Sequence, residues 1–122
     1  MAAASKTAAY FNKTKGVMLA ERARIADAFL DRLVGLLKTS DFQVGDGLFI
    51  VPCNQIHMFG MKYAIDVVFV DKKGIVVGLA ERIGPGQMSK VFPRAHACLE
   101  LPAGVISDTS TSVGDEIETQ VF

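Results

Sequence analysis

Apolar and polar positions recur with a helical period between Arg24 and Lys38. At about 100° per residue, the charged residues gather on one side of the wheel, namely Arg24, Asp27, Asp31 and Lys38. The opposite half is apolar and holds Ile25, Ala26, Phe29, Leu30, Leu33, Val34, Leu36 and Leu37. This pattern predicts an amphipathic helix whose apolar face needs a sheet or barrel to cover. Arg32 falls at the border of that face.

After Ser40 the pattern changes to short β-rich segments separated by glycine and proline. We expect strands over residues 17–23, 48–51, 64–70, 75–79, 95–101 and 116–121. Asp71-Lys72-Lys73-Gly74 suits a type I turn that closes a hairpin between the third and fourth of these. One helix with five or six strands predicts an α+β fold, a small mostly-β barrel-like domain with one flanking amphipathic helix.

Domain organisation follows from pattern and length together. Residues 1–16 are small and polar without a period, so we expect a loose N-terminal arm, followed by a single globular domain over residues 17–122. A chain of 122 residues and 13.1 kDa supports one hydrophobic core. Apolar residues make up 50% and charged residues 21% of the chain, which excludes intrinsic disorder.

The formal net charge is zero, so no overall field attracts nucleic acid or anionic lipid. We therefore expect no nucleic-acid partner.

The charge is nevertheless uneven along the chain. Residues 1–40 carry seven basic and three acidic groups, a net charge of +4, and residues 101–122 carry four acids and no base, a net charge of −4. If the two ends lie close together, they attract each other.

No segment approaches a length of about 20 apolar residues, which a membrane span requires. Residues 1–15 lack the apolar stretch of a secretory signal. The sequence therefore predicts a protein without a membrane span, cytoplasmic as it stands and exported if a leader was removed.

Its two cysteines, Cys53 and Cys98, are too few for a disulfide framework. We expect thiols, with one bridge between them as the alternative.

Several sequence blocks occur together in a specific order and spacing. The most specific are Ile56-His57, Ile65-Asp66-Val67-Val68-Phe69 and Leu99-Glu100-Leu101-Pro102-Ala103-Gly104, joined by Arg32-Leu33-Val34-Gly35-Leu36, Gly47-Leu48-Phe49-Ile50, Pro52-Cys53, Met61, Gly74-Ile75-Val76 and Gly114-Asp115. Over residues 24–118 the chain resembles domain-of-unknown-function family 192. The resemblance implies a compact, mostly-β, barrel-like domain with a flanking helix, no assigned activity, and relatives that are often exported. This chain differs from the usual pattern in having Met58 in place of a hydroxyl residue and Cys98 in place of an aliphatic residue.

Cys53, His57 and Met61 are spaced four residues apart. If the segment is regular, this spacing keeps all three on one face of either a strand or a helix. Thiolate, imidazole and thioether form a soft ligand set suited to monovalent copper. Cys53 and His57 could also converge with His96 and Cys98 as a tetrahedral zinc site. The structural alternative is that Cys53 and Met61 fill the core and His57 hydrogen-bonds a backbone carbonyl.

Nucleophilic catalysis is a further hypothesis for the same residues. Cys53 could act as the nucleophile with His57 or His96 as the base, oriented by a carboxylate of Asp66 or Glu100. The chain shows neither a nucleophile elbow nor an evident oxyanion loop, so this remains the alternative to binding.

The two carboxylates favour a structural interpretation. Asp66 interrupts the apolar run 65–70, and a buried carboxylate needs a partner because an unpaired buried charge is very costly. Arg32, Lys62 or a backbone turn could supply it. We favour a structural hydrogen-bonding role for Asp66, and the same role for Glu100, which strand alternation places on the face of Cys98.

We predict a non-catalytic binding module with its site around His57, whose ligand is a small molecule, a peptide or a soft metal. The candidate residues are Arg32, Cys53, His57, Met61, Asp66 and Glu100. No resident cofactor is expected, with copper or zinc as the alternatives. The other functional hypotheses are a small enzyme that uses the Cys53/His57 pair and a protein interaction module that uses sheet edges or an exposed Met58-Phe59 patch. The pattern assigns no oligomeric state.

Overall fold

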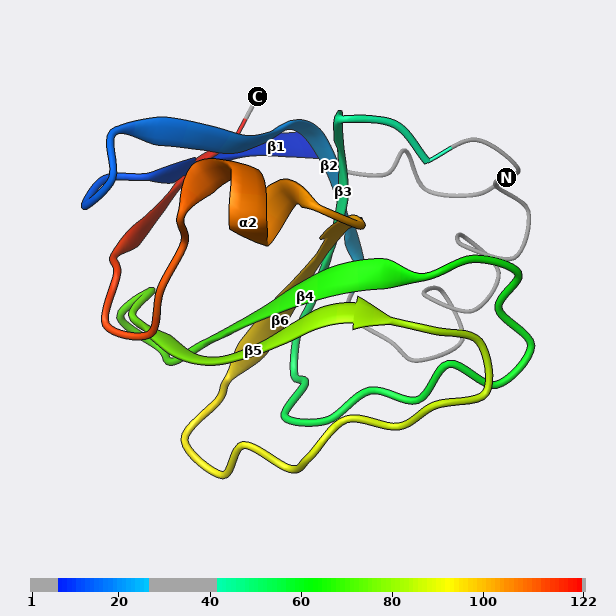
Figure 1. Cartoon of the computed structure of the whole chain (residues 1–122). Helices are drawn as coiled ribbons and strands as arrows, with labels where there is room; N and C mark the ends of the chain where they lie inside the picture. The colour runs from blue at the N-terminus through cyan, green and yellow to red at the C-terminus, as the bar shows by residue number, and fades with distance from the viewer. Residues whose placement is uncertain (1–6, 27–41, 122) are drawn as a thin grey trace, which may run out of the picture.

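The computed structural model describes residues 7–26 and 42–121, and within these ranges it contains strands and one short helix. In chain order the elements are β1 (Thr7–Asn12), β2 (Val17–Ala26), β3 (Gly45–Ile50), β4 (Ile65–Val70), β5 (Val76–Ile83), β6 (Ala97–Pro102), α2 (Val105–Thr109) and β7 (Ile117–Val121) (Figure 1). None of the described helical residues forms a helix long and apolar enough to cross a membrane.

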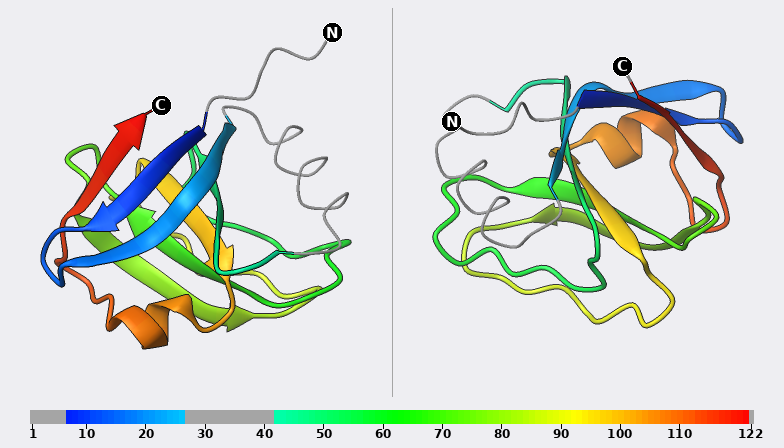
Figure 2. Two further views of the ribbon diagram at one scale, coloured as in Figure 1. Left: turned by 90° about the horizontal axis from the view of Figure 1, so that it is seen from above. Right: turned by 180° about the vertical axis from the view of Figure 1, so that it is seen from behind.

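The described strands form a single sheet in the order β5-β4-β6-β3-β2-β1-β7. Neighbours in this sheet run antiparallel, except for the parallel pair β2 and β3. The sheet curls into a half-barrel (Figure 2), so its first and last strands approach each other. Ile75 and Glu116 form a bridge there, and Ile117 N–H donates to the Gly74 carbonyl at 2.8 Å. Gly74 has φ +83°, and a Cβ on it would lie 2.5 Å from the Ile117 carbonyl oxygen, so this corner requires glycine.

The inside of the curl holds the first of two hydrophobic cores, the inner core. α2 packs its buried Val105 and Ile106 onto this core between β2 and β4 (Figure 1). Tyr10 of β1 stacks on Phe49 of β3 with ring centroids 4.7 Å apart. The buried members of the inner core are Ala8, Tyr10, Leu19, Ala20, Ala23, Val68, Val70, Val76, Ala97, Leu99, Leu101, Val105, Ile106 and Ile117.

The outside of β3, β4 and β6 carries the second core, the outer core. β4 and β6 lie side by side as the second and third strands of the sheet order and are buried along their whole length. Because side chains alternate between the faces of a strand, Val68 and Leu99 contribute to the inner core, while Phe69 and Cys98 contribute to the outer core. The buried members of the outer core are Ala26, Leu48, Ile50, Ile56, Met58, Met61, Ile65, Val67, Phe69, Ile83 and Cys98.

The predicted mostly-β barrel-like architecture is confirmed, and so is the hairpin around residues 71–74, whose strands are β4 and β5.

Two local predictions are wrong. Residues 7–12 of the expected loose arm form β1, because they pair with both β2 and β7. Residues 24–26, expected to begin a helix, end β2 instead, because they pair in parallel with residues 48–50 of β3. The rest of the expected helix, with Arg32, lies outside the described residues, and α2 was not predicted.

Opposite charges join the two ends of the described chain, as the uneven charge distribution predicts. Lys13 lies 3.5 Å from Glu116, and Lys15 lies 3.0 Å from Asp115. Asp115 is 4% exposed, and its carboxylate also accepts hydrogen bonds from the Asn12 side chain and the Ser112 N–H, both at 2.9 Å. Burial alone would raise the pKa of Asp115, but these hydrogen bonds and the Lys15 charge outweigh it and hold the pKa below its usual range.

Replacing Asp115 by asparagine is expected to change the acid sensitivity of the fold. A carboxyl with a depressed folded-state pKa stabilises the protein above its unfolded pKa, here 3.8, and loses that contribution as pH falls through the folded pKa. The difference in free energy of unfolding between wild type and Asp115→Asn should therefore be largest near neutral pH and narrow below about pH 4. Urea unfolding across this pH range tests it, with Asp108→Asn on exposed α2 surface as the control. Parallel pH curves for wild type and Asp115→Asn would contradict it.

Candidate functional site

The outer core is covered by an outer layer, defined as residues 51–64 between β3 and β4 together with residues 84–96 between β5 and β6. Outside an isolated His57–Met88 bridge, neither segment forms a strand or helix. They satisfy their backbone groups largely on each other: Met58 N–H donates to the Gln87 carbonyl at 2.7 Å and Ser89 N–H donates to the Ile56 carbonyl at 2.9 Å. The buried side chains of Ile56, Met58 and Met61 fasten the layer to the outer core. An irregular segment is thus held in a defined shape.

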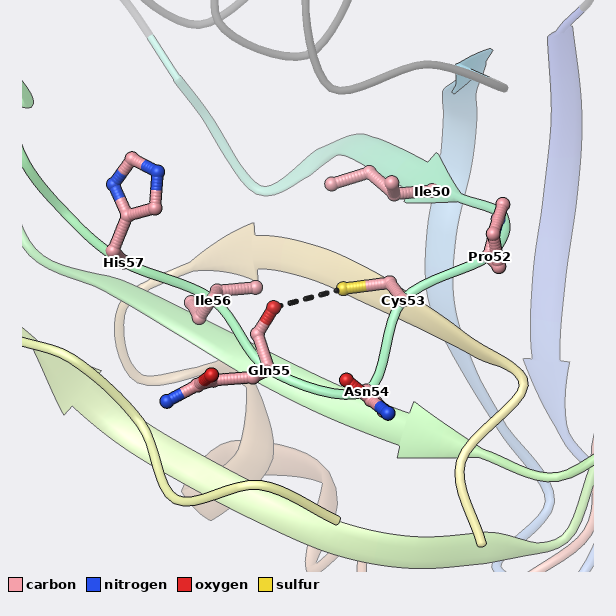
Figure 3. A pocket seen from close by; sticks show the side chains of 7 residues that line it. All are labelled: Ile50, Pro52, Cys53, Asn54, Gln55, Ile56 and His57. Carbon is pink, nitrogen blue, oxygen red and sulfur yellow. Dashed lines mark hydrogen bonds between the residues drawn. The ribbon is translucent and has the colours of Figure 1, made fainter. Parts of the chain in front are cut away.

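A pocket of about 210 Å³ opens beside the first part of this layer (Figure 3). Its apolar wall comes from Ile50, Pro52 and Ile56, and its polar groups are a thiol, two amides and an imidazole, belonging to Cys53, Asn54, Gln55 and His57. The lining therefore contains no carboxylate, ammonium or guanidinium group among the described residues. Such a surface suits an uncharged group.

The His57 imidazole forms one edge of the pocket and continues onto an exposed apolar rim. It stacks on the Phe59 ring with centroids 4.8 Å apart. Phe59 is 55% exposed, and Met88, the bridge partner of His57, is 59% exposed. Met58, expected on an exposed patch, is instead fully buried, because the chain turns its side chain into the outer core.

The sulfur of Cys53 lies against a second sulfur rather than against an imidazole. Its thiol donates to the Gln55 carbonyl at 3.4 Å (Figure 3), and Cys53 Sγ lies 3.1 Å from Cys98 Sγ. The imidazole of His57 lies apart from the Cys53 sulfur, at the other end of the pocket (Figure 3). The predicted copper set of Cys53, His57 and Met61 needs a regular segment to share one face, and this segment is irregular. The copper set therefore stays a prediction, and the structure does not supply the regular segment on which it depends.

The zinc set predicted from Cys53, His57, His96 and Cys98 is not assembled. Throughout residues 7–26 and 42–121, no three side chains of His, Cys, Asp or Glu gather where they could hold a metal ion. His96 does lie next to Cys53 along the backbone, because the Cys53 N–H donates to the His96 carbonyl at 3.0 Å. The contact joins main-chain atoms of the two segments of the outer layer, so it does not assemble a ligand set.

Asp66 has the structural role expected for a buried carboxylate. It is fully buried on the inner face of β4, and its partners are backbone N–H groups. One carboxylate oxygen accepts from Arg82 N–H at 2.8 Å, and the other accepts from Gly104 and Ile106 N–H at 3.0 and 2.9 Å. The carboxylate thereby fixes the end of β5, where Arg82 has φ +50°, and the start of α2. Asp66 faces away from the pocket in the outer layer.

Glu100 is the charged residue of the outer core. It is fully buried on β6, next to Val67 of β4 and Leu48 of β3 in the register of the sheet. Burial and the Glu100 carboxylate raise the pKa of Tyr63 above its usual value, while the Arg24 guanidinium lowers it. Tyr63 therefore belongs to the surroundings of Glu100, and Arg24 to those of Tyr63. The sequence pattern does not mark either residue for this role, because the group assembles only when β2, β6 and the outer layer come together.

The comparisons with known proteins identify relatives but assign no function. The sequence model of family DUF192, described as "Uncharacterized ACR", matches residues 10–119. A UPF0127 protein of Thermococcus sibiricus is 37% identical over 115 residues, which cover 90% of this chain and 73% of that protein. A UPF0127 protein of Pyrococcus furiosus is 31% identical over 112 residues, covering 88% of this chain and 94% of that protein.

Two solved structures share the fold at a TM-score of 0.77. One is a protein of unknown function from Novosphingobium aromaticivorans, with 18% identity, and the match covers 92% of this chain and 83% of that one. The other is described as a putative transcription regulator from Sinorhizobium meliloti, with 19% identity, and the match covers 98% of this chain and 96% of that one. At these identities the likeness shows the fold alone.

Replacing Asp66 by alanine is expected to destabilise the fold strongly. It leaves the buried or half-buried N–H groups of Arg82, Gly104 and Ile106 without their acceptor, so we expect a loss of about 3–5 kcal/mol in the free energy of unfolding. Urea unfolding measures the loss. Glu81→Ala, which removes an exposed acid from β5, should change it by no more than about 0.5 kcal/mol. Equal effects of the two substitutions would contradict the role assigned to Asp66.

Neutralising Glu100 is expected to lower the pKa of Tyr63. The Glu100 carboxylate disfavours the tyrosinate, so Glu100→Gln removes one of the two causes that raise this pKa. The chain has two tyrosines, and a Tyr10→Phe background isolates the Tyr63 signal in an ultraviolet titration. Glu81→Gln in the same background is the control and should leave the titration unchanged. An unchanged Tyr63 titration in the Glu100→Gln variant would show that the two groups do not interact.

Proposed function

This chain belongs to the DUF192 family, and on that premise, which assigns no activity, we propose that it is a non-catalytic binding module. The proposed site is the pocket lined by residue 50 and residues 52–57. The observation that carries the proposal is the lining itself, an apolar wall bordered by polar groups, with no charged side chain among the described residues that line it. This combination is typical of sites for small ligands.

The size and chemistry of the pocket define the ligand class. Its volume of about 210 Å³ lies below the roughly 300–1,000 Å³ of sites that enclose drug-sized molecules. A small uncharged molecule, or one apolar side chain of a peptide, fits this volume. The exposed rim of Phe59 and Met88 continues from the His57 edge, so it would contact the part of a ligand that extends beyond the pocket.

The pocket wall is held in place before any ligand arrives. The Gln55 side-chain amide donates to the Ser89 carbonyl at 3.0 Å, and Ile56 N–H donates to the Ser89 hydroxyl at 3.0 Å. The Phe92 N–H donates to the Asn54 carbonyl at 2.8 Å. Binding to a wall fixed in this way loses little conformational freedom, which supports a binding role.

The placement of the candidate nucleophile favours binding over catalysis. A catalytic thiol needs a base within hydrogen-bond reach, about 2.6–3.2 Å. Cys53 Sγ contacts the Gln55 carbonyl and Cys98 Sγ, and the His57 imidazole lies apart from it (Figure 3). The Cys53/His57 enzyme hypothesis therefore receives no support from this arrangement.

Three probes that share an isobutyl group test the proposal: isobutanol, isovalerate and isobutylammonium. Because the described lining residues include no charged side chain, millimolar isobutanol should shift the backbone amide resonances of residues 53–57, and the two charged probes should shift them less. The measurement is a titration followed by nitrogen–proton correlation spectra of the full chain. Saturable shifts confined to residues 50–57 and their contacts in the outer layer are the expected result.

A pair of histidine variants sharpens this titration. His57→Ala removes one edge of the pocket and should weaken isobutanol binding about fivefold, the equivalent of about 1 kcal/mol. His96→Ala is the matched control because His96 does not line this pocket. The affinity of this variant for isobutanol should equal that of the wild type. Equal weakening by both variants, or tighter binding of a charged probe, would overturn the proposed site.

A further inference from the structure

Two cysteines from separate parts of the chain meet beneath the outer layer. Cys98 lies near the start of β6, and Cys53 lies 45 residues earlier, just after β3. Their sulfur atoms are 3.1 Å apart. We propose that Cys53 and Cys98 are a redox pair that interconverts between two thiols and an intramolecular disulfide.

The register of the sheet creates this proximity. Ile50 of β3 is the cross-strand partner of Cys98, and three residues later the Cys53 N–H donates to the His96 carbonyl at 3.0 Å. The chain after β3 therefore stays attached to β6 and sets Cys53 over Cys98. A disulfide bond is about 2.05 Å long, so the two sulfur atoms need to approach by about 1 Å. Side-chain torsions can supply a movement of this size without breaking the sheet.

The two thiols differ in accessibility, which sets the order of the reaction. Cys53 is partly exposed and lines the pocket, as well as a shallow hollow beside Asn54 and His96. Cys98 is fully buried. An oxidant in solution therefore reaches Cys53 first, and Cys98 then acts as the resolving cysteine.

The oxidant class is a low-molecular-weight disulfide, for which oxidised glutathione serves as the probe. The Cys53 thiolate attacks one sulfur of the probe, forms a mixed disulfide and expels one glutathione thiolate. The Cys98 thiolate then attacks the Cys53 sulfur, forms the Cys53–Cys98 bond and expels the second glutathione. The protein is oxidised by two electrons, oxidised glutathione is reduced to two thiols, and these take up the two protons that the cysteines lose.

This inference does not rest on the proposed binding function, because neither the contact nor the reaction needs a ligand in the pocket. If both hold, oxidation also reshapes the pocket: Cys53 Sγ leaves the Gln55 carbonyl, which it now contacts at 3.4 Å (Figure 3), and turns toward β6. The experiment below contains no pocket ligand, so its failure and a failure of the binding proposal are distinguishable.

The test treats the reduced full-length chain with excess oxidised glutathione and follows the intact mass over time. We expect a transient glutathione adduct, then a monomer that has lost the mass of two hydrogen atoms and no longer reacts with iodoacetamide. After proteolysis, the fragments containing Cys53 and Cys98 should be joined. Because the bond closes a long loop of the unfolded chain, the oxidised form should also unfold at a higher temperature, and a reductant should reverse the shift.

Single-cysteine variants separate the two roles. Cys98→Ser should stop at a stable glutathione adduct on Cys53, and Cys53→Ser should stay unmodified while folded because Cys98 is buried. A wild type that accumulates the stable adduct, forms only intermolecular dimers, or keeps both thiols reactive would overturn the proposal. Equal rates of adduct formation on the two single-cysteine variants would overturn the assigned order of attack.

Discussion

The structure depends on one constraint, which is that β4 and β6 are buried on both faces along their whole length. A strand buried on both faces must be covered twice, and the chain does this in two ways. The sheet curls so that β1, β2 and β7, with α2, cover the inner face (Figure 2), and the irregular outer layer covers the outer face. The two acids of these strands follow the same division, with Asp66 on the inner face and Glu100 on the outer face.

The inner and outer covers differ in what they can do. On the inner side, the Asp66 carboxylate accepts hydrogen bonds from three backbone N–H groups at both of its oxygens, so it fixes the fold. On the outer side, the cover consists of loops that satisfy each other and leave a pocket between a strand end and the returning chain. Loops held on a rigid sheet are where binding residues concentrate. The outer layer is therefore the part of this fold that can vary in function while the strands beneath it stay the same.

The sequence was informative where the determinants are local. The hairpin around Asp71 and Gly74 was predictable because turn residues and alternating strands lie within a few positions of one another. The attraction of the two ends was predictable from charge on the condition that the ends lie close together. β1 was missed because its alanine-rich segment becomes a strand only by pairing with β2 and β7. The approach of Cys53 to Cys98 was open from the sequence only as an alternative, because it depends on strand register and on the return of an irregular loop, which spacing rules do not describe.

Cys53 belongs to both the pocket wall and the sulfur pair, so the two proposals are coupled by thermodynamic linkage. A ligand that binds the dithiol form more tightly than the disulfide form shifts the equilibrium toward the dithiol by the ratio of its two affinities. Oxidation to the disulfide weakens ligand binding by that same ratio. For a two-electron couple, a tenfold preference corresponds to a shift of about 30 mV in the reduction potential. A single partly exposed thiol between a pocket and a buried partner is thus sufficient for the oxidation state and the ligand occupancy to report on each other. No movement of β4 or β6 is needed for this coupling, because only the Cys53 side chain changes partner.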